Sequence, residues 1–167
     1  GARVSRARLI FGISERDRAP WRADGDLGTV LATLRYRLEP RLKAQSIGLR
    51  WQIDELPLMA DLTPQKVLQI QKILLEAFTN IMRHSHASTV VVTAKPKLAA
   101  TSAVPQSIVL TIGDNGVGFD TSLDAQQMPS QGHGLGNMRF RAEAIGAQIS
   151  IARGLPQGTI VSLQIPL

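Results

Sequence analysis

Three short stretches of this chain carry side chains that could do chemistry together. Glu76 and Asn80 are four positions apart in a segment with helical periodicity, so their side chains fall on one face, one turn apart. An Asn oxygen suits Mg²⁺, and a carboxylate one turn back can orient or deprotonate a hydroxyl beside a phosphate. Arg83 can neutralise phosphate charge, and His84 follows Asn80 by four positions. The same pattern also fits an amphipathic helix whose polar side faces water.

The second stretch is an acid followed by two glycines. Asp114, Gly116 and Gly118 come directly after 107–112, where apolar and polar residues alternate as in a strand. A strand that ends this way holds a carboxylate at the edge of the sheet. The backbone after it can approach a flat ligand, because glycine has no Cβ. Taken alone, the pattern is equally typical of a tight turn.

The third stretch is glycine-rich and opens a predicted helix; it consists of Gly132, His133, Gly134, Leu135 and Gly136. Backbone amides at such a helix start can bind an anion. No Gly-Lys-Ser/Thr follows, and no strand runs directly into the stretch, so it fits neither a Walker A loop nor a dinucleotide fingerprint. A flexible loop with a tight turn is the alternative. Jointly, the three stretches supply metal, base and phosphate contacts, which predicts an ATP site.

Two helices are expected in the first half of the chain. The first begins near 24–26 and is marked by an apolar stripe at helical spacing, which Pro40 should kink or split. Residues 49–53 alternate as a half-buried strand. The second helix opens at Thr63 with a proline at its first position and ends near 84–86.

The pattern of the second half of the chain predicts mainly strands. We expect strands at 90–92, 107–112, 147–151 and 159–165, a helix at 135–145, a loop at 95–105 and a mobile loop at 120–131. Because these strands are consecutive and joined by short turns, that part of the sheet should be mainly antiparallel. Helices would cover one face, which makes an α+β two-layer sandwich with a mixed, mostly antiparallel sheet.

Composition narrows the class of protein. The chain has 167 residues, enough for one domain with a core, and with only 4% aromatic residues that core must be aliphatic. It has no cysteine, hence no disulfide or thiolate metal site, and neither a bilayer-spanning apolar run nor a signal-peptide pattern. The net charge is +6, but six arginines of 1–25 account for it, so we expect no nucleic-acid partner. We interpret 1–25 as a linker or the remnant of a preceding dimerisation helix, and 26–167 as the domain.

With these motifs in place, residues 27–167 resemble the ATP-binding catalytic domain of sensor histidine kinases, within the Bergerat-type fold shared with DNA gyrase and heat-shock chaperone ATPases (GHKL, or HATPase_c). The resemblance matches 75–87 to the N box, 114–119 to the G1 box, 132–139 to the G2 box and 158–161 to the last strand. The run Met-Arg-Phe-Arg that ends at Arg141 is similar to the nitrate-sensor and lipid-fluidity-sensor branch of these kinases.

The resemblance implies roles for the site residues. Asp114 would accept a hydrogen bond from the adenine amino group, and Gly116 and Gly118 would let the base seat. Asn80 would coordinate Mg²⁺, and Glu76 would be the polar or base residue beside the γ-phosphate. The further nucleotide-binding residues would be Arg83, His84, Gly132, His133, Gly134, Leu135, Gly136 and Thr159. The mobile loop would be the ATP lid.

A whole histidine kinase also needs a phosphoacceptor histidine on a dimerisation helix. None of His84, His86 and His133 is followed by an acidic residue on a long amphipathic helix, so the acceptor is expected on a domain outside this chain. The resemblance then implies a response regulator as partner, a homodimeric full-length protein, and a cytoplasmic domain of a membrane-anchored kinase. Two alternatives stay open: a non-catalytic nucleotide-binding regulatory module, and an anti-sigma-type serine kinase of the same fold.

Overall fold

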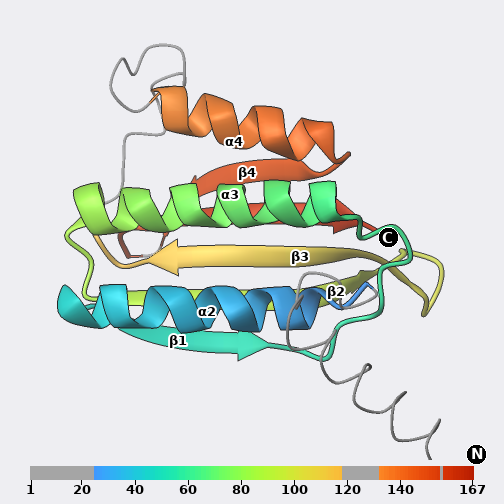
Figure 1. Ribbon diagram of the computed structural model, residues 1–167, viewed down its shortest axis with the longest axis horizontal. Helices are drawn as coiled ribbons and strands as arrows, with labels where there is room; N and C mark the ends of the chain where they lie inside the picture. The colour runs from blue at the N-terminus through green and yellow to red at the C-terminus, as the bar shows by residue number, and fades with distance from the viewer. Residues whose placement is uncertain (1–24, 118–131, 155) are drawn as a thin grey trace, which may run out of the picture.

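Three helices cover one face of a five-stranded sheet in the computed structural model (Figure 1), which describes residues 25–117, 132–154 and 156–167. The arginine-rich segment 1–24, the expected lid 120–131 and Gly118 lie outside the described residues. The predicted α+β two-layer class is confirmed. No helix in the described ranges is both long and apolar enough to cross a membrane.

Helix α2 (Leu27–Ala44) begins where the sequence predicts a start. The Asp26 carboxylate caps it by accepting hydrogen bonds from the Thr29 backbone N–H at 3.3 Å and from the Thr29 hydroxyl at 2.7 Å. The apolar stripe turns inward, and its buried residues are Leu27, Val30, Leu31, Leu34, Leu38 and Leu42.

Pro40 does not split α2, contrary to the expectation from sequence. The helix runs through Pro40 to Ala44 as one element. A proline removes one backbone donor and crowds the carbonyl four residues earlier, here that of Tyr36. Pro40 and Tyr36 are both exposed, so water can solvate the freed carbonyl, while the buried leucines on either side of Pro40 keep their packing.

Helix α3 (Pro64–Asn80) follows a Thr63 cap, whose hydroxyl accepts from the Lys66 backbone N–H at 3.2 Å. Its inward face is apolar, with buried Val67, Ile70, Ile73, Leu74, Ala77 and Phe78. A single π-helical turn, η2 (Ile81–Ser85), continues it, and His86 then reverses the chain in the left-handed region with φ 53°. Helix α4 (Gly132–Ala144) packs beside α3 and against the sheet.

The strands run in the spatial order β1-β2-β3-β5-β4. Strand β1 (Gly48–Ile53) pairs in parallel with β2 (Thr89–Leu98), and all other pairs are antiparallel: β2 with β3 (Pro105–Asp114), β3 with β5 (Thr159–Pro166), and β5 with β4 (Gln148–Arg153). The prediction of a mainly antiparallel sheet after residue 88 is therefore confirmed.

Strand β2 is longer than the sequence indicated, because Pro96 lies inside it. Its pairing with β1 ends at Ala94, so beyond that point one edge of β2 carries no ladder and a missing N–H costs little. Residues 95–98 still pair with β3, and the loop expected at 95–105 shrinks to the hairpin tip. The core is aliphatic, as the composition predicted; Phe78 is the one buried aromatic side chain among the residues that the structure describes.

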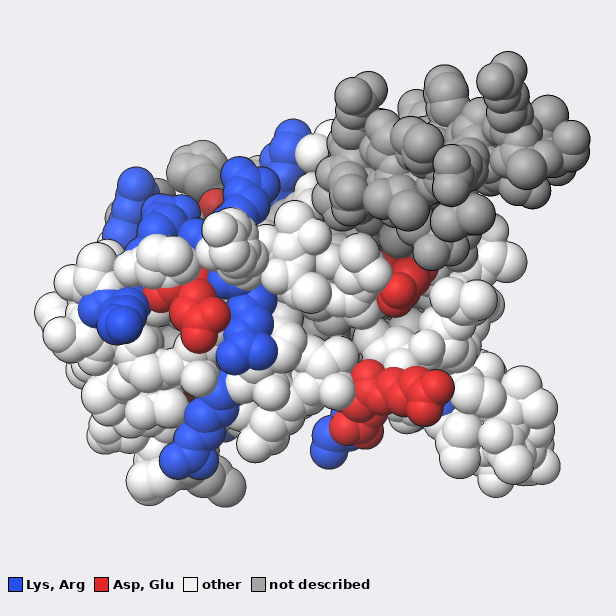
Figure 2. Space-filling view, turned by 60° about the horizontal axis from the view of Figure 1, so that its bottom comes forward, with Lys and Arg blue, Asp and Glu red and all other residues white. Residues whose placement is uncertain are grey.

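The surface over α2 and β1 carries charges of both signs. Figure 2 shows Lys and Arg side chains grouped on one side of this face, with Asp and Glu side chains among and beside them. Arg37, Arg41 and Lys43 of α2 and Arg50 of β1 are exposed. Mixed signs of this kind are typical of a solvated protein surface.

Candidate functional site

Three of the predicted motifs converge at one end of the sheet. The C-terminal end of α3, the C-terminal end of β3 and the first turn of α4 all point to that end in Figure 1. The start of β5 joins them, because Asp114 pairs with Thr159 across the β3–β5 ladder. The sheet order thus brings together segments separated by tens of residues in sequence.

Asp114 is the last residue of β3 and is only 9% exposed. Its carboxylate accepts a hydrogen bond from the Gly116 backbone N–H at 2.8 Å. Burial raises the pKa of the Asp114 carboxyl, while backbone hydrogen bonds from Gly116 and Thr159 act in the opposite direction. The result is a buried acceptor at the strand end, held in orientation by the backbone around it.

Position 116 must be a glycine, because Ser85 at the end of the N-box segment leaves no room for a Cβ. A Cβ at Gly116 would lie 2.2 Å from the carbonyl oxygen of Ser85, closer than any real contact. The Val117 backbone N–H donates to the same Ser85 oxygen at 2.8 Å. Ser85 is in turn held by its own hydroxyl, which donates to the Ile81 carbonyl at 2.7 Å. The acid–glycine turn therefore lies directly against the turn that ends α3 and η2.

Asn115 joins this turn to the start of β2. Its side-chain oxygen accepts from the backbone N–H groups of Ser88 and Thr89, both at 2.9 Å, and its amide nitrogen donates to the Ser88 hydroxyl at 2.8 Å. The Asn115 carbonyl accepts from the Gln157 side chain at 2.9 Å, which adds the β4–β5 turn. The sequence analysis included Asn115 in the 114–119 motif but did not predict that it joins three segments of the chain.

Gly158 completes the junction from the other side. It has φ 103°, and a Cβ there would lie 1.8 Å from the Asp114 carbonyl oxygen. Only glycine fits a position that is both left-handed and this close to another backbone. Thr159, predicted to help hold the adenine site, is half-buried directly after it.

The α-helix ends at Asn80, and the predicted polar residues after it lie in a different kind of turn. Arg83 and His84 lie in η2, whose wider π-helical turn changes the side-chain register, and both are exposed. Asn80 and Glu76 are half-buried on α3 itself. Glu76 and Asn80 therefore lie one turn apart on α3, as predicted, and the roles of Arg83 and His84 stay predictions.

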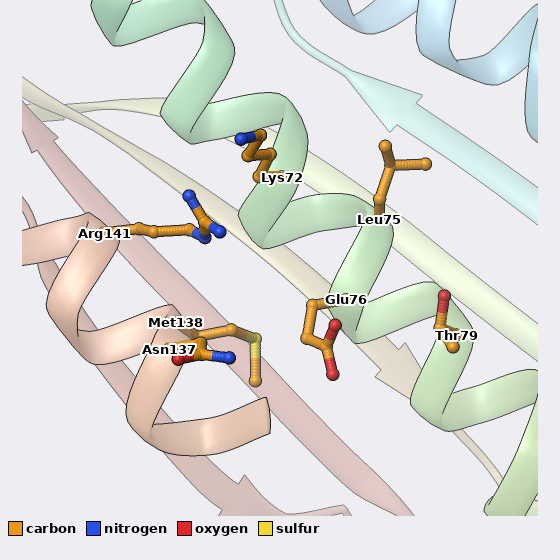
Figure 3. A pocket seen from close by; sticks show the side chains of 7 residues that line it. All are labelled: Lys72, Leu75, Glu76, Thr79, Asn137, Met138 and Arg141. Carbon is orange, nitrogen blue, oxygen red and sulfur yellow. The ribbon is translucent and has the colours of Figure 1, made fainter. Parts of the chain in front are cut away.

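A pocket of about 290 Å³ opens between α3 and α4. Glu76 lines it, and Figure 3 shows its carboxylate on the side where Asn137 and Met138 approach from α4. The other lining residues are Lys72, Leu75, Thr79 and Arg141. The sequence analysis named Glu76 as a candidate site residue but not Lys72 or Asn137. The proximity of these residues depends on how the two helices pack.

The glycine-rich stretch does open a helix, since α4 begins at Gly132. The side chains of 131–135 lie outside the described residues, so His133 and Leu135 stay predictions. Gly136 is exposed, and a Cβ there would meet nothing within 4 Å. The start of α4 thus leaves room beside its backbone at Gly136.

The sequence profile of the family described as "Histidine kinase-, DNA gyrase B-, and HSP90-like ATPase" matches residues 65–167. The chain belongs to this family. Sensor histidine kinase YxjM of Bacillus subtilis is 33% identical over 143 residues, which cover 83% of this chain and 30% of that protein. Sensor protein VraS of Staphylococcus aureus is 34% identical over 96 residues, 58% of this chain and 24% of VraS. The chain thus spans less than a third of either relative.

Solved structures of histidine kinases share the fold. The catalytic domain of histidine kinase ThkA superposes with a TM-score of 0.67 at 15% identity, over 84% of this chain and 91% of that one. The fold is that of histidine kinase catalytic domains, and the family match confirms the resemblance stated from the motifs.

Proposed function

We propose that this chain binds Mg-ATP at the junction of α3, β3, β5 and α4, and donates the γ-phosphoryl group to a histidine on a dimerisation domain outside the chain. The observation that carries the proposal is the buried Asp114 carboxylate, oriented by backbone donors at the strand end. Family membership adds the nucleotide class, and full-length ShkA, of the same fold, was solved with the ATP analogue AMPPNP at a TM-score of 0.67 and 22% identity.

The roles of the residues follow from their chemistry. An ionised Asp114 accepts a hydrogen bond from the exocyclic amino group of adenine, which a guanine cannot supply at that position. Glu76 would act as a base or polar contact near the γ-phosphate, and its half-buried position in the lining of the α3–α4 pocket supports this role. Phosphoryl transfer of this kind depends mainly on positioning and on charge neutralisation.

The oxygen donors near Asn80 are compatible with the Mg²⁺ ion that we propose. Within the described residues, no group of three or more His, Asp or Glu side chains could hold a metal ion. Mg²⁺ does not need such a group, because it keeps several waters and takes further oxygens from substrate phosphates. The Asn80 amide oxygen on α3 is the protein ligand that we assign to it, and the ion would neutralise phosphate charge there.

The proposal also covers the longer protein to which this domain would belong. YxjM and LiaS are named sensor histidine kinases, so we assign it a dimerisation and phosphoacceptor domain, a response regulator as phosphoryl acceptor, and membrane anchorage with this domain on the cytoplasmic side. The segment 1–25 would link the catalytic domain to the dimerisation helices.

Calorimetric titration with AMPPNP tests the nucleotide site. We expect saturable binding by the parent chain and a loss of about 30-fold or more in Asp114→Asn, since hydrogen bonds to charged groups contribute about 1.5–3 kcal/mol. An Asn there offers its one oxygen to the backbone donors, so its NH₂ group meets the adenine amino group, donor against donor. Parent-like binding by Asp114→Asn would remove the adenine assignment.

Phosphotransfer to a supplied dimerisation domain tests the reaction. With γ-labelled ATP, the parent chain should label a histidine in trans, and Asn80→Asp should slow that labelling more than it weakens binding. Labelling of a serine, or of no residue at all, would contradict the histidine kinase assignment.

A further inference from the structure

Two cationic side chains, Lys72 and Arg141, line one end of the pocket between α3 and α4. Figure 3 shows Arg141 reaching from α4 toward α3 on the side where Lys72 lies, whereas the Glu76 carboxylate lies farther along α3, nearer Met138 and Asn137 than Lys72 does. Lys72 and Glu76 are one turn apart on the same face of α3. The pocket therefore has a cationic end and an end lined by Glu76.

Arg141 is anchored without being neutralised. Its guanidinium donates from Nη1 to the side-chain oxygen of Gln69 at 3.0 Å, and this bond links α4 to α3. Gln69 is an uncharged partner, and a guanidinium has five N–H donors, so most of its hydrogen-bonding capacity is left over. In the described part of the chain, neither Arg141 nor Lys72 forms an ion pair with Glu76.

The order of residues along α3 fixes which part of a nucleotide the cations can reach. With a rise of about 1.5 Å per residue, Lys72 lies about 12 Å along the helix from Asn80, and Glu76 lies halfway. Asp114 is at the Asn80 end of the helix, across the Gly116–Ser85 contact. A nucleotide with its base at Asp114 and its metal at Asn80 would bring only its last phosphate toward Lys72 and Arg141.

We propose that Lys72 and Arg141 bind the terminal phosphoryl group of the nucleoside triphosphate, so that this pocket discriminates ATP from ADP, and that Gln69 is the positioning residue for Arg141. This inference rests on the proposed function. A guanidinium held in place by a neutral amide suits the bidentate recognition of a phosphoryl group, and the Lys72 ammonium adds a second charge.

The ratio of two affinities tests the proposal. We compare AMPPNP and ADP binding, both with Mg²⁺, in Lys72→Gln, Arg141→Gln and, as a charge-matched control, Lys97→Gln on β2. Each pocket variant should lose about tenfold in AMPPNP affinity, as expected when one charge-assisted contact is removed. ADP affinity should stay within about twofold in the same variants, and both affinities should be unchanged in the control. Equal losses for the two nucleotides, or no loss, would overturn the assignment.

Gln69→Glu tests the positioning role with the helix contact preserved. The new carboxylate would keep the bond to Arg141 and neutralise it, so AMPPNP affinity should fall while ADP affinity and the circular dichroism spectrum stay at parent values. If Gln69→Glu bound both nucleotides as the parent does, the charge of Arg141 would have no role in binding.

The two proposals fail in different ways. A parent chain that binds neither nucleotide would remove the nucleotide site altogether. A parent chain that binds both, with an AMPPNP-to-ADP ratio that no pocket variant changes, would leave the nucleotide site standing and refute only the role of the cations.

Discussion

At the Asp114 end of the β2–β3 ladder, side chains bond across segments that are far apart in sequence, whereas within the hairpin tip at residues 99–104 the bonds stay local. Asn115 binds the backbone of Ser88, 27 residues away, and Gln157 binds the Asn115 carbonyl from 42 residues away. At the hairpin tip, Ala99 bonds to Val104 and Ser102 to its neighbours, and the register shifts at Lys97/Leu98. A bond from the Gln164 side chain to the Ser107 hydroxyl at 3.2 Å ties the base of the hairpin to β5, and the tip beyond it only turns the chain.

The largest effect that separates the two ends should come from Gly158→Ala. The new Cβ would lie 1.8 Å from the Asp114 carbonyl oxygen at φ 103°, so the β4–β5 turn must move away from β3. We expect a loss of about 3 kcal/mol or more in the free energy of unfolding, measured with urea, as for other backbone clashes at special φ values. Gly136→Ala is the control: its Cβ meets nothing within 4 Å, and because Gly136 lies in α4 the change should cost no stability and can add up to about 1 kcal/mol.

Asn115→Ala should have the next largest effect. It removes three side-chain hydrogen bonds to Ser88 and Thr89, all at an exposed site where water can replace them. We therefore expect a loss of about 1–2 kcal/mol in stability, and a loss of AMPPNP affinity as the Asp114 turn loosens. Affinity and stability equal to those of the parent would show that the long-range bonds at this end are dispensable.

The pH dependence of Asp114 should sharpen the contrast further. Because the pKa of its carboxyl is raised in the folded chain, the stability that the protonated form contributes is present at acid pH and is lost as pH rises through that pKa. AMPPNP affinity should change in the opposite direction and weaken on acidification, since the ionised form is the better acceptor. Urea unfolding and titration between about pH 4 and 8 measure both, and Asp114→Asn should flatten both profiles.

The smallest effect should come from Ser102→Ala at the hairpin tip. Its hydroxyl accepts from the Val104 backbone N–H at 3.1 Å, and both residues are exposed. We expect a change within about 0.5 kcal/mol and unchanged AMPPNP affinity. A loss as large as that of Asn115→Ala would mean that the two ends do not differ in the way their bonds suggest.

Local signals were sufficient for most elements. The Thr63 cap, the proline after it and the apolar spacing define α3 within a few residues, so its prediction needed no tertiary information. The fold class likewise followed from the order of helices and strands, whereas the meeting of Glu76, Asn80 and Asp114 in one nucleotide site stays a prediction. Pro40 and Pro96 were misjudged because the cost of a proline depends on whether its surroundings are solvated or unpaired, and local sequence does not show this.

Features that depend on two packed elements could not be read from the chain. Asn115 precedes a glycine after a strand, which signals a side chain that bonds nearby backbone, but its partners are 26 and 27 residues away. The Arg141–Gln69 bond spans 72 residues and exists only because α4 packs on α3. The π-helical turn at Ile81–Ser85 likewise has no local signature in its five residues.

Strand β5 lies between β3 and β4, although it is the last of the five strands in sequence. Until β5 pairs, β3 has a ladder partner only on its β2 edge, and the other edge is open. A chain emerging from the ribosome would therefore display a central strand with one open edge until most of this domain had been synthesised. We expect slow folding of high contact order, with co-translational aggregation as its main hazard and a chaperone-sensitive yield.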